Sequence, residues 1–370
     1  MYGLPGKVAL DVGALAAEPA GVGTYAHRLA LALGELLGER LILLGVRPEA
    51  DLSGLPGSVT RLPFGGGSYQ VWLQRRADGD ARRAGASVTH YVTGFAPLLT
   101  RQPMVITVHD ISVLRHPGTH PLPRLATLPI SLAAIVRAGA IVVPSRWTRR
   151  ELLRGLRVSP RRVTVIEHAP TLETADAATT AATVGRFGLA GAEYLVHVGT
   201  LEPRKNIDGL VAAFERVAES RPNLRLVLAG APGWHYAPIR RRIESSALAD
   251  RIVLTGYVSA AEAAALTAAG QALCYVSIYE GFGMPVLDAM ALGTPVVCSD
   301  RTAMPEAAAG AAVLVDPHDV GDIARGIERA LAMRDRLSAA GLQRAAGRQW
   351  ADVAAEHLDV YRRAISASDR

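Results

Sequence analysis

Residues 272–291, ALCYVSIYEGFGMPVLDAMA, join a short apolar run to a glycine-rich turn and then to the beginning of a helix. The apolar run, Ala272–Ser277, has the length of a buried strand. Pro285 suits the first turn of a helix, where its missing N–H would have no intrahelical partner. A strand that leads through such a turn into a helix is the repeating unit of parallel α/β sheets, in which ligands lie beyond the carboxyl ends of the strands.

Apolar runs alternate with amphipathic stretches along nearly the whole chain, as in sheets with crossover helices. The predicted strands of the first half are Val8–Val12, Leu41–Gly45, Val88–Tyr91, Met104–Val108, Ala140–Pro144 and Val163–Glu167. Those of the second half are Tyr194–Gly199, Arg225–Gly230, Ile252–Gly256, Ala272–Ser277, Pro295–Ser299 and Ala312–Val315. The predicted fold class is therefore α/β, with two doubly wound Rossmann-like domains that face each other across a cleft.

The segment Thr171–Thr183, TLETADAATTAAT, separates these halves and has few large apolar residues and no clear period. We interpret it as a linker or a surface excursion between domains. The predicted divisions are a first domain over 1–170, a linker over 171–187, a second domain over 188–349 and a C-terminal helical segment over 350–370. The last segment is expected to pack back on the first domain.

Composition limits the classes of function. The chain has 370 residues, is 49% hydrophobic and carries a formal net charge of +6, but it has no apolar run of the ~20 residues that span a membrane. Its two cysteines lie in apolar runs, which indicates reduced thiols in a cytoplasmic protein. Arginines cluster in the first half, so phosphate-bearing partners or an anionic membrane surface could be attracted there, although solvated helix faces explain them equally well. Basic residues are not interleaved with surface aromatics, so no nucleic acid is expected.

The loop after Tyr194–Gly199 reads GTLEPRKN over 199–206. It places Arg204 and Lys205 before a predicted helix, with Asn206 as the expected N-cap. Cations at a helix N-terminus oppose the helix dipole, so an anion is expected to compensate them, and a diphosphate suits a guanidinium beside an ammonium. The alternative is a solvated Arg-Lys pair.

The turn that follows Ala272–Ser277 carries Glu280, and the helix after it carries Asp288. Two carboxylates are poor partners for a diphosphate, but each can accept hydrogen bonds from two hydroxyls of a sugar or a ribose. The pattern therefore predicts a nucleotide-sugar site, with the helix start directed at phosphate. A helix-start charge stabilised by the dipole is the alternative for Asp288.

A third loop, over 13–23, ends in Gly21-Val22-Gly23 at the start of a predicted helix. Glycines there allow a ligand to approach the backbone closely, but an ordinary helix start remains the alternative.

The motifs HVGTLEPRKN (197–206) and YEGFGMPVLDAMALGTPVV (279–297), supported by GVGTY (21–25) and TVHDIS (107–112), resemble family 4 of the retaining glycosyltransferases. The bacterial mannosyltransferases of polysaccharide and glycolipid synthesis are the most similar in character. The resemblance implies the two-domain GT-B fold, with an N-terminal acceptor-binding domain and a C-terminal nucleotide-sugar domain.

The resemblance also implies roles for single residues. Arg204 and Lys205 would hold the donor diphosphate, Glu280 the transferred sugar, and His109 would lie near that sugar. The remaining donor-binding residues would be Gly21, Gly23, Thr200, Glu202, Tyr257, Val258, Gly281, Phe282, Gly283, Met284, Leu287 and Asp288. Asp288 stands where the family usually has a ribose-binding glutamate, so its contact is expected to be looser, bridged by water or made after a small helix shift. Glu167-His168-Ala169-Pro170 departs from the usual Asn-Gly turn.

The expected activity is transfer of a hexose, first of all mannose from GDP-mannose, to a glycan or lipid-linked acceptor with retention of configuration. No metal and no other cofactor is expected, because the one Asp-x-Asp sequence, Asp78-Gly79-Asp80, lies among arginines in a helical stretch. The alternatives are a catalytically impaired subunit that binds nucleotide-sugar or glycan as a scaffold, and another GT-B enzyme of sugar phosphates. The protein is expected to be cytoplasmic, with reversible contact to the inner face of the membrane.

Overall fold

The computed structural model describes residues 6–16, 21–120 and 122–368. The chain divides into two compact units. Unit 1 comprises Met1–Arg115, Leu122–Ala169 and Arg348–Arg370, and unit 2 comprises His116–Pro121 and Pro170–Gly347. Each unit contains one sheet, and every strand pairing in both sheets is parallel.

Unit 1 is built on a seven-stranded sheet of order β3-β2-β1-β4-β5-β6-β7. Its strands are β1 (Lys7–Asp11), β2 (Leu41–Val46), β3 (Thr60–Pro63), β4 (Ala86–Tyr91), β5 (Met104–Thr107), β6 (Ala140–Val143) and β7 (Val163–Val165). Its helices are α1 (Val22–Leu37), α2 (Tyr69–Arg75), α3 (Ala77–Arg83), α4 (Ser112–Arg115), α5 (Leu122–Ala126), α6 (Leu128–Arg137), α7 (Arg146–Gly155) and α16 (Trp350–Ser368), with 3₁₀ turns η1 (Gly38–Arg40) and η3 (Pro160–Arg162).

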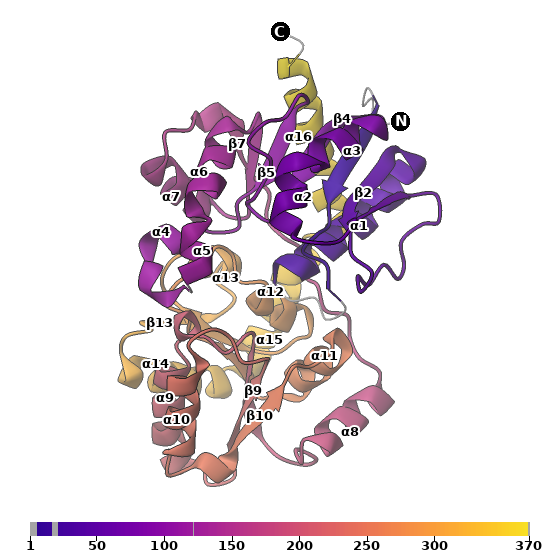
Figure 1. Ribbon diagram of the computed structural model, residues 1–370. Coiled ribbons are helices and arrows are strands. Elements are labelled where there is room, and N and C mark those ends of the chain that lie inside the picture. The colour runs from indigo at the N-terminus through magenta and orange to yellow at the C-terminus, as the bar shows by residue number, and fades with distance from the viewer. Residues whose placement is uncertain (1–5, 17–20, 121, 369–370) are drawn as a thin grey trace. The chain divides into compact units, whose positions relative to one another are not determined.

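Both faces of this sheet are covered. Val8 and Leu10 pack with α1 and α16 in one core cluster, whereas Ala9 between them packs with α2, α3, α6 and α7 in another, because successive side chains of a strand point to opposite faces. Double burial explains why these strands appear in the sequence as continuous apolar runs. In Figure 1 the yellow α16 lies among the indigo and purple elements of unit 1.

Unit 2 is built on a six-stranded sheet of order β10-β9-β8-β11-β12-β13. Its strands are β8 (Tyr194–Val198), β9 (Arg225–Ala229), β10 (Ile252–Gly256), β11 (Ala272–Tyr275), β12 (Val296–Ser299) and β13 (Val313–Val315). Its helices are α8 (Ala177–Arg186), α9 (Ile207–Ser220), α10 (Tyr236–Glu244), α11 (Ala260–Ala269), α12 (Met284–Ala291), α13 (Met304–Ala308), α14 (Val320–Ala332) and α15 (Arg334–Ala346), with 3₁₀ turns η2 (Pro117–Thr119), η4 (Pro203–Lys205) and η5 (Ala249–Arg251).

The strand order in each unit runs outward in one direction and then reverses. The reversal lies between β1 and β4 in unit 1 and between β8 and β11 in unit 2. In doubly wound sheets the crevice for a ligand opens at this reversal, beyond the carboxyl ends of the strands. The loops after β8 and β11 are therefore brought together, although more than 70 residues separate Lys205 from Glu280.

The predicted α/β class with two doubly wound parallel sheets is confirmed, and all twelve predicted strands are present. Two elements differ from the sequence-based prediction, and the role of Asn206, described below, is a third difference. Strand β3 was not predicted, because its residues alternate between exposed and half-buried and it ends in Pro63 at the edge of the sheet. The linker segment contains helix α8, which the Asp176 carboxylate caps by accepting from the Thr179 amide. Alanine favours helix even where large apolar residues are few.

Asn206 occupies the predicted N-cap position of α9, but its side chain does not cap the helix. Its Nδ2 instead donates to the carbonyl oxygens of Val276, at 3.2 Å, and Pro317, at 2.7 Å. Asn206 therefore fastens the loop after β8 to the loop after β11. Its left-handed backbone, with φ of 57°, is one that asparagine tolerates better than most residues,.

Candidate functional site

Arg204, Lys205 and Glu280 lie close together at the carboxyl edge of the unit 2 sheet. Strands β8 and β11 are neighbours there, with Ala272 opposite Leu195 and Leu273 opposite Val196. The loop after β8 supplies the two cations, and the turn after β11 supplies Glu280. This pairing of strands explains why two motifs far apart in sequence form one site.

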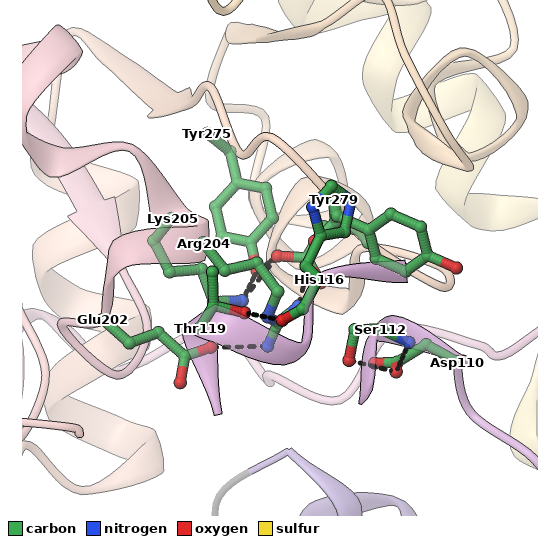
Figure 2. Close-up of polar contacts among 10 residues, drawn as sticks. Asp110, Ser112, His116, Thr119, Glu202, Arg204, Lys205, Tyr275 and Tyr279 are labelled. Carbon is green, nitrogen blue, oxygen red and sulfur yellow. Dashed lines mark hydrogen bonds and ion pairs between the residues drawn. The ribbon is translucent and has the colours of Figure 1, made fainter. Parts of the chain in front are cut away.

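Four charged side chains and one phenol form a buried cluster there, which we call the Lys205 cluster (Figure 2). Lys205 Nζ donates to Glu280 Oε1 at 2.6 Å and to Tyr275 Oη at 2.5 Å. Arg204 Nη1 donates to Glu280 Oε2 at 2.9 Å, and its Nη2 donates to Glu202 Oε1 at 2.6 Å. The side chains of Lys205 and Glu280 are each only 9% exposed. Two cations and two carboxylates thus balance each other in a region with little solvent.

The pKa values in the Lys205 cluster follow from this balance. Burial raises the pKa of Glu280, but Arg204 and Lys205 outweigh burial and bring that pKa to about 2. Burial lowers the pKa of Lys205, while Glu280 opposes the effect. Because a buried charge is tolerated only when it is paired, an anionic ligand that binds here must replace one of these ion pairs with another.

The anion expected to compensate the two cations is present within the chain itself. Glu202 and Glu280 supply the negative charge that was expected from a bound ligand.

Figure 2 also shows His116 beside Tyr279, with ring centroids 5.1 Å apart. The segment His116–Pro121 is thus part of unit 2 although most residues around it in sequence belong to unit 1, which no sequence pattern indicated.

The predicted phosphate cradle lies at the start of α12. Gly283 is the N-cap residue, with φ of 105°, and a Cβ there would lie 2.3 Å from Met304 Cε, so both conformation and space favour glycine,. The side chains of Phe282 and Leu287 are buried in the core. Their predicted contact with phosphate would therefore have to come from backbone groups, and Pro285 lies in the first turn of α12 as predicted.

Asp288 makes contacts that the sequence did not predict. Its Oδ1 accepts from the backbone amides of Thr171, at 2.5 Å, and Leu172, at 3.1 Å, and its Oδ2 accepts from Thr171 Oγ1 at 2.8 Å. The carboxylate on α12 thus holds the start of the segment that precedes α8. Its ribose contact stays a prediction, and Thr171 is a residue that sequence reasoning missed.

The other predicted donor-binding residues are spread over several loops. Thr200 and Gly281 lie on the loops after β8 and β11, and Met284 is the first residue of α12. Tyr257 and Val258 follow β10, which β9 separates from β8.

Three predicted residues lie in unit 1. Gly21 is the N-cap of α1 and Gly23 is buried within that helix, whereas residues 17–20 of the same glycine loop lie outside the described residues. His109 follows β5, and its Nε2 donates to the Val92 carbonyl oxygen at 2.8 Å,. His109 also lines a cavity of about 110 Å³ at the carboxyl ends of β4 and β5, whose walls are mostly apolar and include Thr93, Asp110 and Ser131.

Across the described ranges, His, Cys, Asp and Glu side chains do not gather in groups of three or more that could hold a metal ion. Within the same ranges, each helix is too short or too polar to cross a bilayer. The reversible membrane contact stays a prediction.

Comparison with known proteins identifies the family. Residues 19–171 match the family described as Glycosyltransferase Family 4, and residues 187–346 match Glycosyl transferases group 1. The O-antigen chain mannosyltransferase B of Escherichia coli is 32% identical over 265 residues, which are 70% of this chain and 70% of that protein. The chain belongs to glycosyltransferase family 4.

Solved structures of similar fold agree with the family 4 assignment. A sucrose-phosphate synthase from Thermosynechococcus elongatus superposes with a TM-score of 0.76 at 20% identity, covering 98% of this chain and all of that one. HepE from Anabaena, solved in complex with UDP and glucose, gives a TM-score of 0.73 at 16% identity, covering 95% of this chain and 98% of that one. At such identities the likeness concerns the fold alone, and that fold is GT-B. This family 4 protein is thus a glycosyltransferase.

Proposed function

We propose that the chain transfers a hexose from a nucleotide-diphosphate sugar to a glycan or lipid-linked acceptor, with retention of configuration and without a metal ion. Mannose from GDP-mannose is the first donor to test, because the E. coli relative is an O-antigen chain mannosyltransferase. The UDP complex of HepE makes a uridine nucleotide the next. The observation that carries the proposal is the Lys205 cluster, in which two cations and the Glu280 carboxylate lie at the carboxyl edge of the unit 2 sheet.

Arg204 and Lys205 would stabilise the departing diphosphate. A leaving nucleotide diphosphate gains negative charge as its bond to the anomeric carbon breaks, and preorganised cations in a site with little water stabilise that charge strongly. The backbone at the start of α12 adds N–H groups and the positive end of the helix dipole. These groups can stabilise the negative charge of the leaving diphosphate, which a metal ion stabilises in other enzymes, and this supports a metal-independent reaction.

Glu280 would bind hydroxyls of the transferred sugar. An ionised carboxylate has about four acceptor positions, and Glu280 stays ionised at neutral pH because its pKa is about 2. When Lys205 turns to the diphosphate, Oε1 loses one donor and can accept from a sugar hydroxyl instead. Ligand binding would thus exchange one set of paired charges for another.

The chemical step would occur on one face of the sugar. The acceptor oxygen bonds to the anomeric carbon on the side from which the diphosphate leaves, through an oxocarbenium-like state. The bond from that carbon to the phosphate oxygen breaks, and the acceptor's proton passes to the leaving phosphate. Because the acceptor enters on the face from which the diphosphate leaves, configuration would be retained without a covalent intermediate on the protein.

The proposal is tested by ranking nucleotides on the purified full chain. We expect GDP to raise the unfolding temperature more than UDP, ADP or dTDP, because GDP-mannose is the first donor proposed. A ligand at 100 times its dissociation constant adds about 2.7 kcal/mol of stability, which is enough to rank the nucleotides. The variant Lys205→Ala should lose most of that increase. Arg240→Ala, which removes an exposed ion pair with Glu244 on α10, is the matched control and should keep it. If none of the four nucleotides or their sugar conjugates stabilises the protein, the proposed function is wrong.

A further inference from the structure

Tyr275, the last residue of β11, lies inside the Lys205 cluster. Its side chain is buried, and its hydroxyl contacts both members of the central ion pair. Lys205 Nζ donates to Oη at 2.5 Å, and Oη donates its own proton to Glu280 Oε1 at 3.1 Å. A single neutral group therefore joins the cation assigned to the diphosphate and the carboxylate assigned to the sugar.

The ring of Tyr275 is held firmly. It stacks on the ring of His197 from β8, with centroids 5.5 Å apart and planes 12° apart. His197 is itself fixed, because its Nδ1 donates to the Cys274 carbonyl oxygen at 3.1 Å. The hydroxyl is thus a fixed acceptor for a flexible side chain.

This arrangement solves a problem that ligand binding creates. A diphosphate competes with Glu280 for the lysine, and lysine is a point charge on a four-carbon chain with many rotamers. An ammonium that left Glu280 without another acceptor would be free to take several positions. Tyr275 can keep one N–H of Lys205 while the others turn to phosphate. Burial and Glu280 raise the pKa of the phenol well above its ordinary value, so the hydroxyl stays neutral and leaves the lysine charge available.

We propose that Tyr275 is a positioning residue, whose hydroxyl holds Lys205 Nζ in place while Glu280 exchanges the lysine for hydroxyls of the donor sugar. The inference rests on the proposed function, since it acts through Lys205. It predicts a loss in the chemical step more than in donor binding, because a loosely held ammonium still attracts a diphosphate but stabilises the transition state less.

The test is Tyr275→Phe, which removes only the hydroxyl. We expect kcat to fall about tenfold or more, equivalent to ~1.4 kcal/mol, while KM for the donor changes by less than about threefold. Tyr194→Phe is the matched control, because Tyr194 is also buried, begins the neighbouring strand β8, and donates its hydroxyl to the Leu266 carbonyl oxygen at 2.8 Å. Its kcat should stay within about twofold of the wild type.

A double-mutant cycle separates positioning from a structural role. If Tyr275 acts through Lys205, adding Tyr275→Phe to Lys205→Ala should reduce kcat by less than about twofold further. Undiminished kcat in Tyr275→Phe, a full additional loss in the double variant, or a loss matched by the fraction of unfolded protein would each overturn the proposal. If the wild type neither turns over nor binds a nucleotide, the proposed function fails first, which distinguishes the two failures.

Discussion

The two units handle buried polar groups differently. In unit 2 the Lys205 cluster balances full charges, with Lys205 and Glu280 2.6 Å apart. In unit 1 a cluster of comparable burial is neutral: His90 lies 2.8 Å from Tyr361 Oη and 2.7 Å from Thr107 Oγ1, and Tyr25 Oη lies 2.9 Å from His357 Nε2. We call this second group the histidine network.

We propose that the difference distinguishes a binding site, the Lys205 cluster, from a structural network that stabilises unit 1. The histidine network joins α16 to α1 and to strands β4 and β5, so its hydrogen bonds hold the C-terminal helix to the sheet of unit 1. Neutral groups that satisfy one another have nothing to exchange with an anionic ligand. Charged groups that balance one another can exchange an internal partner for a phosphate at little net cost, since both states are paired.

The largest expected effect is that of Lys205→Ala on turnover. The wild type should exceed this variant at least about hundredfold in kcat, because one preorganised donor to a developing oxyanion contributes about 3–4 kcal/mol. The measurement is steady-state release of nucleotide diphosphate with a saturating acceptor, and Arg240→Ala serves again as the control. A loss smaller than about tenfold, ~1.4 kcal/mol, would count against the assigned role and against the contrast between the clusters.

The second effect is on stability and concerns the histidine network. Burial lowers the pKa of His357 from 6.5 to about 4, so between these values the unfolded chain binds a proton that the folded unit does not. Stability therefore falls as pH decreases from 6.5 to 4, by about 3 kcal/mol for this group, and is constant above and below that window. Burial raises the pKa of Asp11 to about 6, so the contribution of Asp11 to stability increases as pH decreases, opposite to that of His357. The pH dependence of the wild type alone therefore does not isolate the effect of His357.

The measurement is denaturant unfolding at pH 7 and pH 5, with hydrogen exchange followed in α16. His357→Gln should be less stable than the wild type at pH 7, and the gap should narrow by about 2 kcal/mol at pH 5. The exposed His318→Gln should follow the wild type at both pH values. A constant gap would show that His357 is not kept neutral by the fold.

The smallest expected effect concerns the hydrogen bonds between Asp288 and the segment that begins at Thr171. Thr171→Val removes the hydroxyl that donates to Oδ2 at 2.8 Å and should cost about 1.5 kcal/mol of unfolding free energy, the value of a hydrogen bond to a charged group. Thr180→Val removes a hydroxyl that donates to the carbonyl oxygen of Asp176, the N-cap residue of α8, and should cost less. Equal losses in equilibrium unfolding would mean that the Asp288 contact contributes nothing beyond a local hydrogen bond.

Local sequence determined most strands and helices and identified the charged side chains of the candidate site. Twelve apolar runs form the predicted strands, and those in the middle of each sheet, such as β1 and β8, are nearly continuous apolar runs because both faces of the sheet are covered,. Pro285 marked the start of α12, and Arg204, Lys205 and Glu280 were recognisable from their loops. Strand β3 and helix α8 were missed because an edge strand and an alanine-rich helix leave only a weak periodic signal.

Tertiary structure alone decided which side chains are partners. The order of the strands, which no single strand encodes, made β8 and β11 neighbours and so brought Tyr275 and Glu280 to Lys205. It also brought Thr171 to Asp288 and His357 to Tyr25, pairs separated by 117 and 332 positions. Hydrogen bonds and ion pairs depend on ångström distances between residues remote in sequence, and those distances exist only once both sheets have formed.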